Sequence, residues 1–148
     1  MLFIKLLLDD IKNQVIGIDE VGRGAFCGPV VSCSILLEKK ILNNSLVFQI
    51  TDSKKLSHKK RSILSKFIKE YSSYSIGVAN NIEIDEMNIL NATHLAMKRA
   101  INNIQIKPEK ILIDGKYVPS GLLNAEAFIG GDKLHQQIML LMVQLQDC

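Results

Sequence analysis

The sequence predicts a single α/β domain, in which short apolar strands alternate with amphipathic helices. Three observations lead to this prediction. Runs of β-branched and apolar residues occur at 15–19, 29–37 and 110–114. Two longer segments, from about 56 to 70 and from 84 to 101, repeat their apolar residues at helical spacing. The chain has 148 residues, a length that buries one hydrophobic core.

The first predicted strand ends in two adjacent carboxylates, Asp19 and Glu20. A turn with glycines on both sides of Arg23 follows, and a second apolar run begins after Gly28 and Pro29. Carboxylates at the end of a buried strand are costly to desolvate unless a partner neutralises them, and a divalent cation is a common partner. This stretch therefore indicates either a metal-dependent, phosphate-handling site or a hairpin whose turn is simply charged.

A helix to about Glu70 is predicted next, and Thr51, Asp52 and Ser53 offer capping oxygens ahead of it. Its inward stripe consists of Leu56, Ile63, Leu64, Phe67 and Ile68. Seven basic residues and no acidic one occur between positions 54 and 69. This block is typical of a solvated helix face, and it also fits contact with a polyanion.

The remaining elements complete the predicted sheet and its cover. They are a loop at 38–45, a turn at 71–73, a strand at 74–79, a helix at 84–101 and a strand at 110–114. The last strand ends in Asp114, directly before Gly115. Two strands thus bring carboxylates to their carboxyl ends, where α/β sheets place their sites. This recurrence favours the metal-site interpretation over the charged hairpin.

Other reactive residues lack the spacing of a metal or disulfide site. The three cysteines form no CxxC pair, which favours a reducing compartment, and the three scattered histidines are predicted to be incidental. Asp85 and Glu86 lie at a helix start, where capping is a better explanation than metal binding. The apolar opening segment is too short to span a bilayer, and no cleavage site follows it. We therefore expect a cytoplasmic protein with no membrane partner.

Four motifs stand in order along the chain. They are Gly17-Ile18-Asp19-Glu20-Val21-Gly22-Arg23-Gly24 with Gly28-Pro29-Val30-Val31, then Asp52-Ser53-Lys54-Lys55-Leu56, then the segment 84–100, then Leu112-Ile113-Asp114-Gly115. Together they closely resemble the signature of bacterial type 2 ribonuclease H, the ribonuclease HII family. The resemblance implies an RNase H-like fold, with a mixed sheet flanked by helices. It also implies a monomeric endonuclease that cuts RNA in RNA–DNA hybrids and at single ribonucleotides embedded in duplex DNA.

The same resemblance implies site residues and a cofactor. The cofactor would be Mg²⁺ or Mn²⁺, for which oxygen ligands are suited. The catalytic metal ligands would be Asp19, Glu20 and Asp114. The ribose 2′-hydroxyl would be sensed by Gly22, Arg23 and Gly24. The nucleic-acid backbone would lie near Ser53, Lys54 and Lys55.

The resemblance extends over residues 14–134 and then stops. The family continues into an Ala- and Ser-rich helix that carries a fourth metal-binding Asp, followed by a tyrosine-bearing segment. Residues 135–148 match neither. We therefore predict an incomplete catalytic domain at 1–134, with its C-terminal helices missing, and a divergent tail at 135–148 produced by truncation or a frame shift. Weak or absent activity is expected of such a chain, and the alternative is a non-catalytic remnant or nucleic-acid-binding fragment of the same fold.

Overall fold

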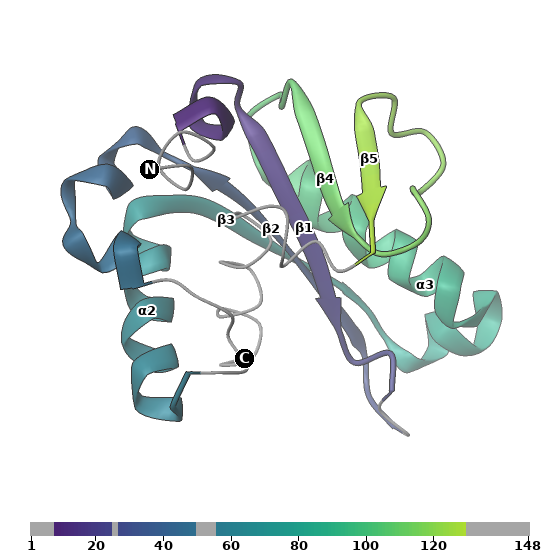
Figure 1. Cartoon of the computed structure of the whole chain (residues 1–148). Helices are drawn as coiled ribbons and strands as arrows, with labels where there is room; N and C mark the ends of the chain where they lie inside the picture. Colours follow the sequence, from purple (N-terminus) through teal and green to yellow (C-terminus); the bar gives the residue numbers. More distant parts are fainter. Residues whose placement is uncertain (1–7, 25–26, 50–55, 130–148) are drawn as a thin grey trace.

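The structure is a computed structural model, and it describes residues 8–24, 27–49 and 56–129 (Figure 1). Its named elements are β1 (Val15–Val21), β2 (Val30–Leu37), the 3-10 helices η1 (Lys39–Asn43) and η2 (Ser45–Gln49), α2 (His58–Tyr71), β3 (Ser72–Ala79), α3 (Asn81–Asn103), β4 (Lys110–Asp114) and β5 (Ala125–Phe128). The predicted capping residues at 51–53 and the predicted tail at 135–148 lie outside the described residues.

The strands form one mixed sheet in the order β3-β2-β1-β4-β5. β2 pairs antiparallel with both β1 and β3, whereas β4 pairs parallel with both β1 and β5. The arrowheads of β1, β4 and β5 accordingly point to the same edge of the sheet (Figure 1). The predicted mixed sheet flanked by helices is confirmed, and β1 lies at its centre.

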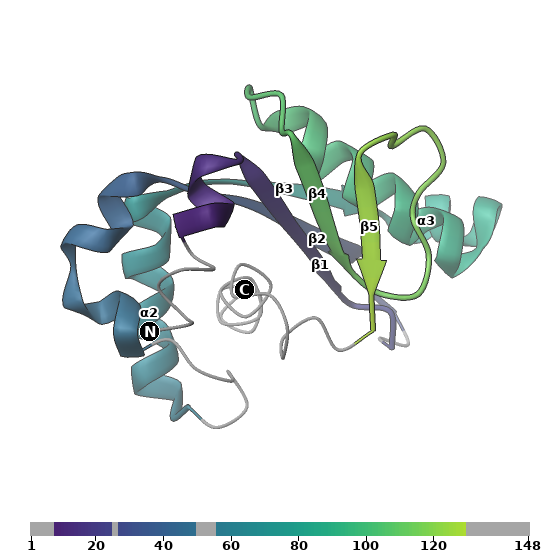
Figure 2. The ribbon, with the colours of Figure 1, turned by 45° about the horizontal axis from the view of Figure 1, so that its top comes forward.

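Helices cover the two faces of the sheet separately (Figure 2). On one face, Ile16 and Ile18 of β1 pack with Met97 and Ile101 of α3. The core of the opposite face joins β2, η1, η2 and α2, and its buried residues are Cys33, Ile35, Leu37, Ile41, Val47, Leu56, Leu64, Phe67 and Ile68. Alternation along β2 sends successive side chains to these two layers, which explains why the strand is apolar nearly throughout.

The backbone of α3 approaches the sheet closely at Gly77. A Cβ atom at this position would lie 2.0 Å from the Ala96 carbonyl oxygen and 2.5 Å from the Ala100 backbone nitrogen. The hydroxyls of Ser34 and Ser75 both donate to the Ala100 carbonyl oxygen, at 2.9 and 2.5 Å. Small and hydroxylated residues on β2 and β3 therefore fix the position of α3.

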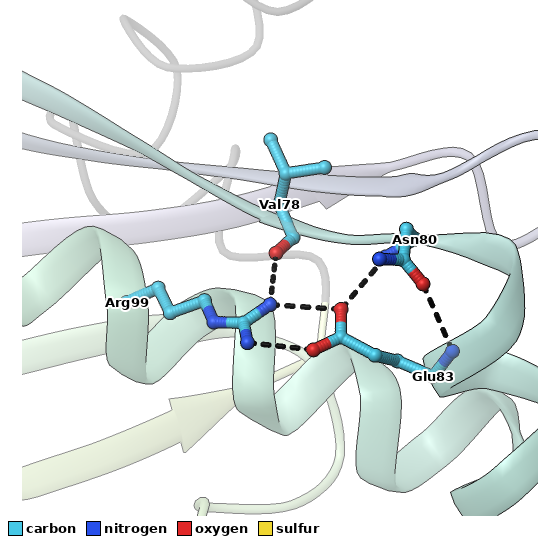
Figure 3. A network of polar contacts seen from close by, with 4 residues as sticks. All are labelled: Val78, Asn80, Glu83 and Arg99. Atoms are coloured by element: carbon cyan, nitrogen blue, oxygen red, sulfur yellow. Dashed lines mark hydrogen bonds and ion pairs between the residues drawn. The ribbon is translucent and has the colours of Figure 1, made fainter.

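A network of polar contacts fixes the start of α3 (Figure 3). Asn80 and Glu83 form a capping box, with both hydrogen bonds at 3.0 Å. Arg99 donates to both Glu83 carboxylate oxygens, at 2.6 and 2.9 Å, and to the Val78 carbonyl oxygen at 2.6 Å. The hydrogen bonds from Arg99 lower the pKa of Glu83 to about 2. One arginine thus ties the carboxyl-terminal part of α3 to its first turn and to edge strand β3.

Asn88 interrupts α3, at φ 70° and ψ 163°. Its side-chain oxygen accepts hydrogen bonds from the Leu90 and Asn91 amides at 3.0 and 3.1 Å. Asn88 therefore caps a second helical segment, although it occupies a region of backbone conformation that is almost restricted to glycine. The apolar spacing from 84 to 101 predicted one uninterrupted helix, because a change of axis leaves no trace in that spacing.

Several predicted boundaries were wrong. α2 begins after Ser57, whose hydroxyl accepts a hydrogen bond from the Lys60 amide at 3.4 Å. Ile63 is 48% exposed, although its spacing placed it among the buried residues of the helix. No turn separates α2 from β3, because Ser72 directly follows Tyr71. The predicted loop at 38–45 contains η1, and β5 was not predicted. No helix in the described part of the chain is long and apolar enough to cross a membrane.

We expect Gly77→Ala to lower the free energy of unfolding by about 3 kcal/mol, because the new methyl group meets backbone atoms of α3 that cannot move aside without displacing the helix. Urea denaturation followed by circular dichroism measures the change. Gly24→Ala is the matched control, since nothing lies within 4 Å of a Cβ at that position. A loss below about 0.5 kcal/mol at Gly77 would contradict this close packing.

Candidate active site

Carboxylates gather where the two central parallel strands end. The ladder between β1 and β4 ends with the pair Ile18 and Ile113, so the next residues, Asp19 within β1 and Asp114 at the end of β4, lie at the same level on adjacent strands. Asp19 accepts a hydrogen bond from the Glu20 amide at 2.7 Å. The predicted convergence of both strands on one sheet edge is confirmed, and it follows from parallel register alone.

Glu20 points to the α3 face of the sheet, on the same side as Ile16 and Ile18. Its side chain is only 11% exposed, and burial is the main cause that raises its carboxyl pKa above the ordinary value of 4.5. Asp114 raises that pKa further, while Arg23 lowers it. The folded chain therefore holds a carboxylate where negative charge is unfavourable.

One oxygen of Glu20, Oε2, is buried and has no hydrogen-bond partner among the described residues. Ser32 lies directly opposite Glu20 in the antiparallel ladder between β1 and β2, and its hydroxyl is also buried without a partner there. Buried polar atoms normally have partners. Two such atoms facing each other mark a position that suits a bound cation or an ordered water.

The turn after β1 carries Arg23, whose side chain is 47% exposed. Arg23 Nη1 lies 3.3 Å from Glu20 Oε1, which is long for a charge-assisted hydrogen bond. Gly22 has a φ of 96°, and a Cβ there would come within 2.4 Å of the Pro29 carbonyl oxygen. Gly22 is thus required by the path of the chain, whereas Gly24 faces open space and leaves room for a ligand.

Two cavities flank this turn, and α3 lines both of them. The first, of about 240 Å³, is lined by Gly22 together with residues of α3 that lie mostly before the Asn88 break, including Asp85, and with Ile89 directly after it. The second, of about 180 Å³, is lined by Glu20, Arg23 and Asp114 together with residues after the break, including His94. The histidines are predicted to be incidental, and the structure brings one of them, His94, into the lining of the cavity that Glu20 and Asp114 also line. Sequence spacing gave no signal for this placement.

The residues fit a divalent cation in chemistry but do not form a closed ligand set. Within residues 8–24, 27–49 and 56–129, no three His, Cys, Asp or Glu side chains group closely enough to hold a metal ion. Successive strand residues point to opposite faces, so Asp19 and Glu20 diverge. The unpaired buried oxygen of Glu20 and the all-oxygen donor set nevertheless suit Mg²⁺ or Mn²⁺.

The other residues that the sequence predicted to contact nucleic acid or to cap a helix lie partly inside and partly outside the described part of the chain. Ser53, Lys54 and Lys55 lie outside the described part of the chain. The lysines of α2, namely Lys59, Lys60, Lys66 and Lys69, are exposed on the outer side of the helix. Asp85 and Glu86 are also exposed, and the acidic residue that caps α3 is Glu83. The exposed lysines agree with a solvated helix face and with a polyanion surface alike.

Comparison with known sequences identifies one family. The family model for "Ribonuclease HII" matches residues 16–137. The chain is 44% identical over 127 residues to ribonuclease HII of Acinetobacter baylyi, a match that covers 84% of this chain and 65% of the relative. It is 40% identical over 131 residues to ribonuclease HII of Ehrlichia chaffeensis, covering 88% and 62%. The chain thus spans a little under two thirds of the length of these relatives.

Comparison with solved structures confirms the fold. The ribonuclease H2 of Pyrococcus horikoshii superposes with a TM-score of 0.70 at 23% identity, covering 89% of this chain and 70% of that one. Bst-RNase HIII in complex with Mn²⁺ superposes with a TM-score of 0.72 at 17% identity, covering 95% and 53%. The predicted RNase H-like architecture is therefore confirmed.

We expect Glu20→Gln to stabilise the chain at neutral pH. The folded state holds the Glu20 proton more tightly than the unfolded state, so wild-type stability falls as pH rises from 4.5 through the raised pKa. The neutral variant avoids this loss. It should match the wild type at pH 4 and exceed it by about 1 kcal/mol at pH 7, as measured by urea denaturation.

Glu86→Gln, at an exposed carboxylate of α3, is the control and should show no such pH-dependent gain. A variant Glu20→Gln that is less stable than the wild type at pH 7 would show that the Arg23 pair outweighs the burial of the carboxylate.

Proposed function

The chain belongs to the ribonuclease HII family, and from this membership we propose that it hydrolyses the RNA strand of RNA–DNA hybrids and cuts at single ribonucleotides embedded in duplex DNA. The observation that carries the proposal is the end of the ladder between β1 and β4, where Asp19 and Asp114 follow the last paired residues of adjacent parallel strands, next to the buried Glu20. We also propose that it acts as a monomer in the cytoplasm.

We propose that Asp19, Glu20 and Asp114 hold Mg²⁺ or Mn²⁺. When bound, such ions activate a water molecule and stabilise negative charge on the leaving 3′-oxygen of the scissile phosphodiester. Glu20 keeps an unpaired oxygen in a site where burial strengthens electrostatic interactions. Arg23, at 3.3 Å from Glu20, supplies positive charge to the phosphate side of the site.

Recognition of RNA is assigned to the turn Gly22-Arg23-Gly24. A 2′-hydroxyl distinguishes a ribonucleotide from a deoxyribonucleotide without any reading of the base. The open space around Gly24 lets a sugar approach the backbone, and the constrained Gly22 fixes where that backbone lies. Ser53, Lys54 and Lys55 are proposed to contact the phosphate backbone, and the exposed lysines of α2 extend the same positive surface.

The first test is cleavage of a labelled duplex that carries one ribonucleotide, with Mn²⁺ or Mg²⁺ present. We expect cleavage at the ribonucleotide, and Asp19→Asn should slow it at least about 100-fold, because metal-bound charge stabilisation contributes several kcal/mol. Glu86→Gln is the control, since it removes an exposed carboxylate of α3 that lines neither cavity. Equal rates for Asp19→Asn and the wild type would refute the assignment.

A non-catalytic function is the alternative, and the lack of a closed three-residue ligand set in the described part of the chain favours it. A binding protein would retain a hybrid duplex in EDTA and would not cut it when Mn²⁺ is added. Thermal denaturation separates the two cases independently of turnover. We expect millimolar Mn²⁺ to raise the midpoint temperature of thermal unfolding of the wild type but not that of Asp19→Asn. No shift for either protein would support the binding alternative.

A further inference from the structure

The cavity of about 180 Å³ beside Glu20 has a wall whose residues the proposed mechanism does not use. Its floor is apolar and consists of Leu90, Met97 and Ile113. Pockets that enclose a whole small-molecule ligand usually measure about 300–1,000 Å³. A cavity of this size therefore suits one ring of a larger molecule, and its apolar floor suits the face of a sugar ring.

The two sides of this cavity carry opposite charge. Glu20 and Asp114 form one edge, at the proposed reaction centre, while Lys116 and Tyr117 line the cavity from the segment that follows β4. Tyr117 is 52% exposed, and the ammonium of Lys116 lies 5.3 Å from the centre of its ring. The cation suits a phosphate group, and the exposed aromatic ring suits part of a nucleotide that packs on it. Because both lie near two carboxylates, they would hold these groups next to the reacting bond.

The segment that bears these two residues is held in place at both ends. The Gly115 amide donates to the Phe128 carbonyl oxygen of β5 at 2.9 Å. Lys98 of α3 donates to the Ser120 hydroxyl at 3.4 Å, and Asn124 donates to the Pro108 carbonyl oxygen at 2.7 Å. Lys116 and Tyr117 therefore have a defined position relative to the carboxylates, as a ligand-binding group requires.

His94 completes this wall from α3. An imidazole ring can hydrogen-bond a hydroxyl group through either of its two nitrogens. Among the groups of a nucleotide, the sugar hydroxyl meets this description.

We propose that His94, Lys116 and Tyr117 form a subsite for the nucleotide adjoining the scissile bond. Tyr117 packs on its sugar ring, Lys116 pairs with its phosphate, and His94 hydrogen-bonds a ribose hydroxyl. This subsite rests on the proposed function, because its ligand is part of the same nucleic-acid substrate. It adds a second group of contacts, on the α3 side of the carboxylates, to those of the Gly22-Arg23-Gly24 turn.

Fluorescence anisotropy tests the subsite with the full chain and a labelled RNA–DNA hybrid in EDTA, where no cleavage occurs. We expect Tyr117→Ala to weaken binding about tenfold, as for loss of one stacking contact, and Tyr117→Phe to bind like the wild type. Tyr74→Ala is the matched control, because Tyr74 is a similarly exposed tyrosine (40%) on β3. Circular dichroism verifies that each variant is folded.

Two further variants test the individual roles. Lys116→Ala should weaken the salt dependence of binding: the negative slope of log affinity against log salt concentration should become less steep by about 0.7–0.9, the amount for one phosphate contact. Lys107→Ala, an exposed lysine near the opposite end of β4, should leave the slope unchanged. His94→Ala should reduce the preference for the hybrid over an all-DNA duplex several-fold, which a purely structural role would not do.

The outcomes separate the subsite from the proposed function. If the wild type binds the hybrid while Tyr117→Ala and Lys116→Ala bind as tightly as their controls, the subsite is wrong and the proposed function stands. If the wild type does not bind the hybrid at all, the proposed function fails and the subsite fails with it. Selective weakening by Tyr117→Ala, with rescue by Tyr117→Phe, supports the subsite.

Discussion

The parallel pairing of β1 with β4 is the constraint on which the rest of the site depends. A ladder that matches Ile18 with Ile113 necessarily ends with Asp19 beside Asp114, whatever the loops do. The antiparallel partner on the other side of β1 then sets Ser32 opposite Glu20. One register thus brings together, at a single edge of the sheet, residues that lie up to 95 positions apart in the chain.

Apolar packing keeps that register in place. A shift of β1 by one residue would place Gly17 and Asp19 on the α3 face instead of Ile16 and Ile18. The loss of these buried apolar side chains makes the shifted register unfavourable. The close approach of α3 at Gly77, together with the hydroxyls of Ser34 and Ser75, fixes the helix that closes this face. The position of the α3 wall near the carboxylates is therefore set by residues far from the proposed chemistry.

Unfavourable local features concentrate around the same edge. Glu20 is a buried carboxylate with one oxygen that lacks a partner in the described part of the chain, and Asn88 adopts a backbone conformation that costs about 1–3 kcal/mol. Gly22 is confined by the Pro29 carbonyl. Such features are expected where a protein prepares a site for a charged ligand, because the ligand supplies the missing neutralisation. The Asn88 break also explains how one helix lines a cavity on each side of the Arg23 turn.

The sequence by itself determined strands at 15–19, 29–37 and 110–114 from their apolar runs, and the structure extends the first strand to Val21 and begins the second at Val30. It also determined the family through four ordered motifs. Tertiary structure decided what local patterns cannot encode. Ser57 caps α2 in the described structure. Ile63 is exposed because Leu64, Phe67 and Ile68 occupy the buried side of the helix. That His94 and Glu20 line the same cavity depends on how α3 crosses the sheet, which is a property of packing between distant segments.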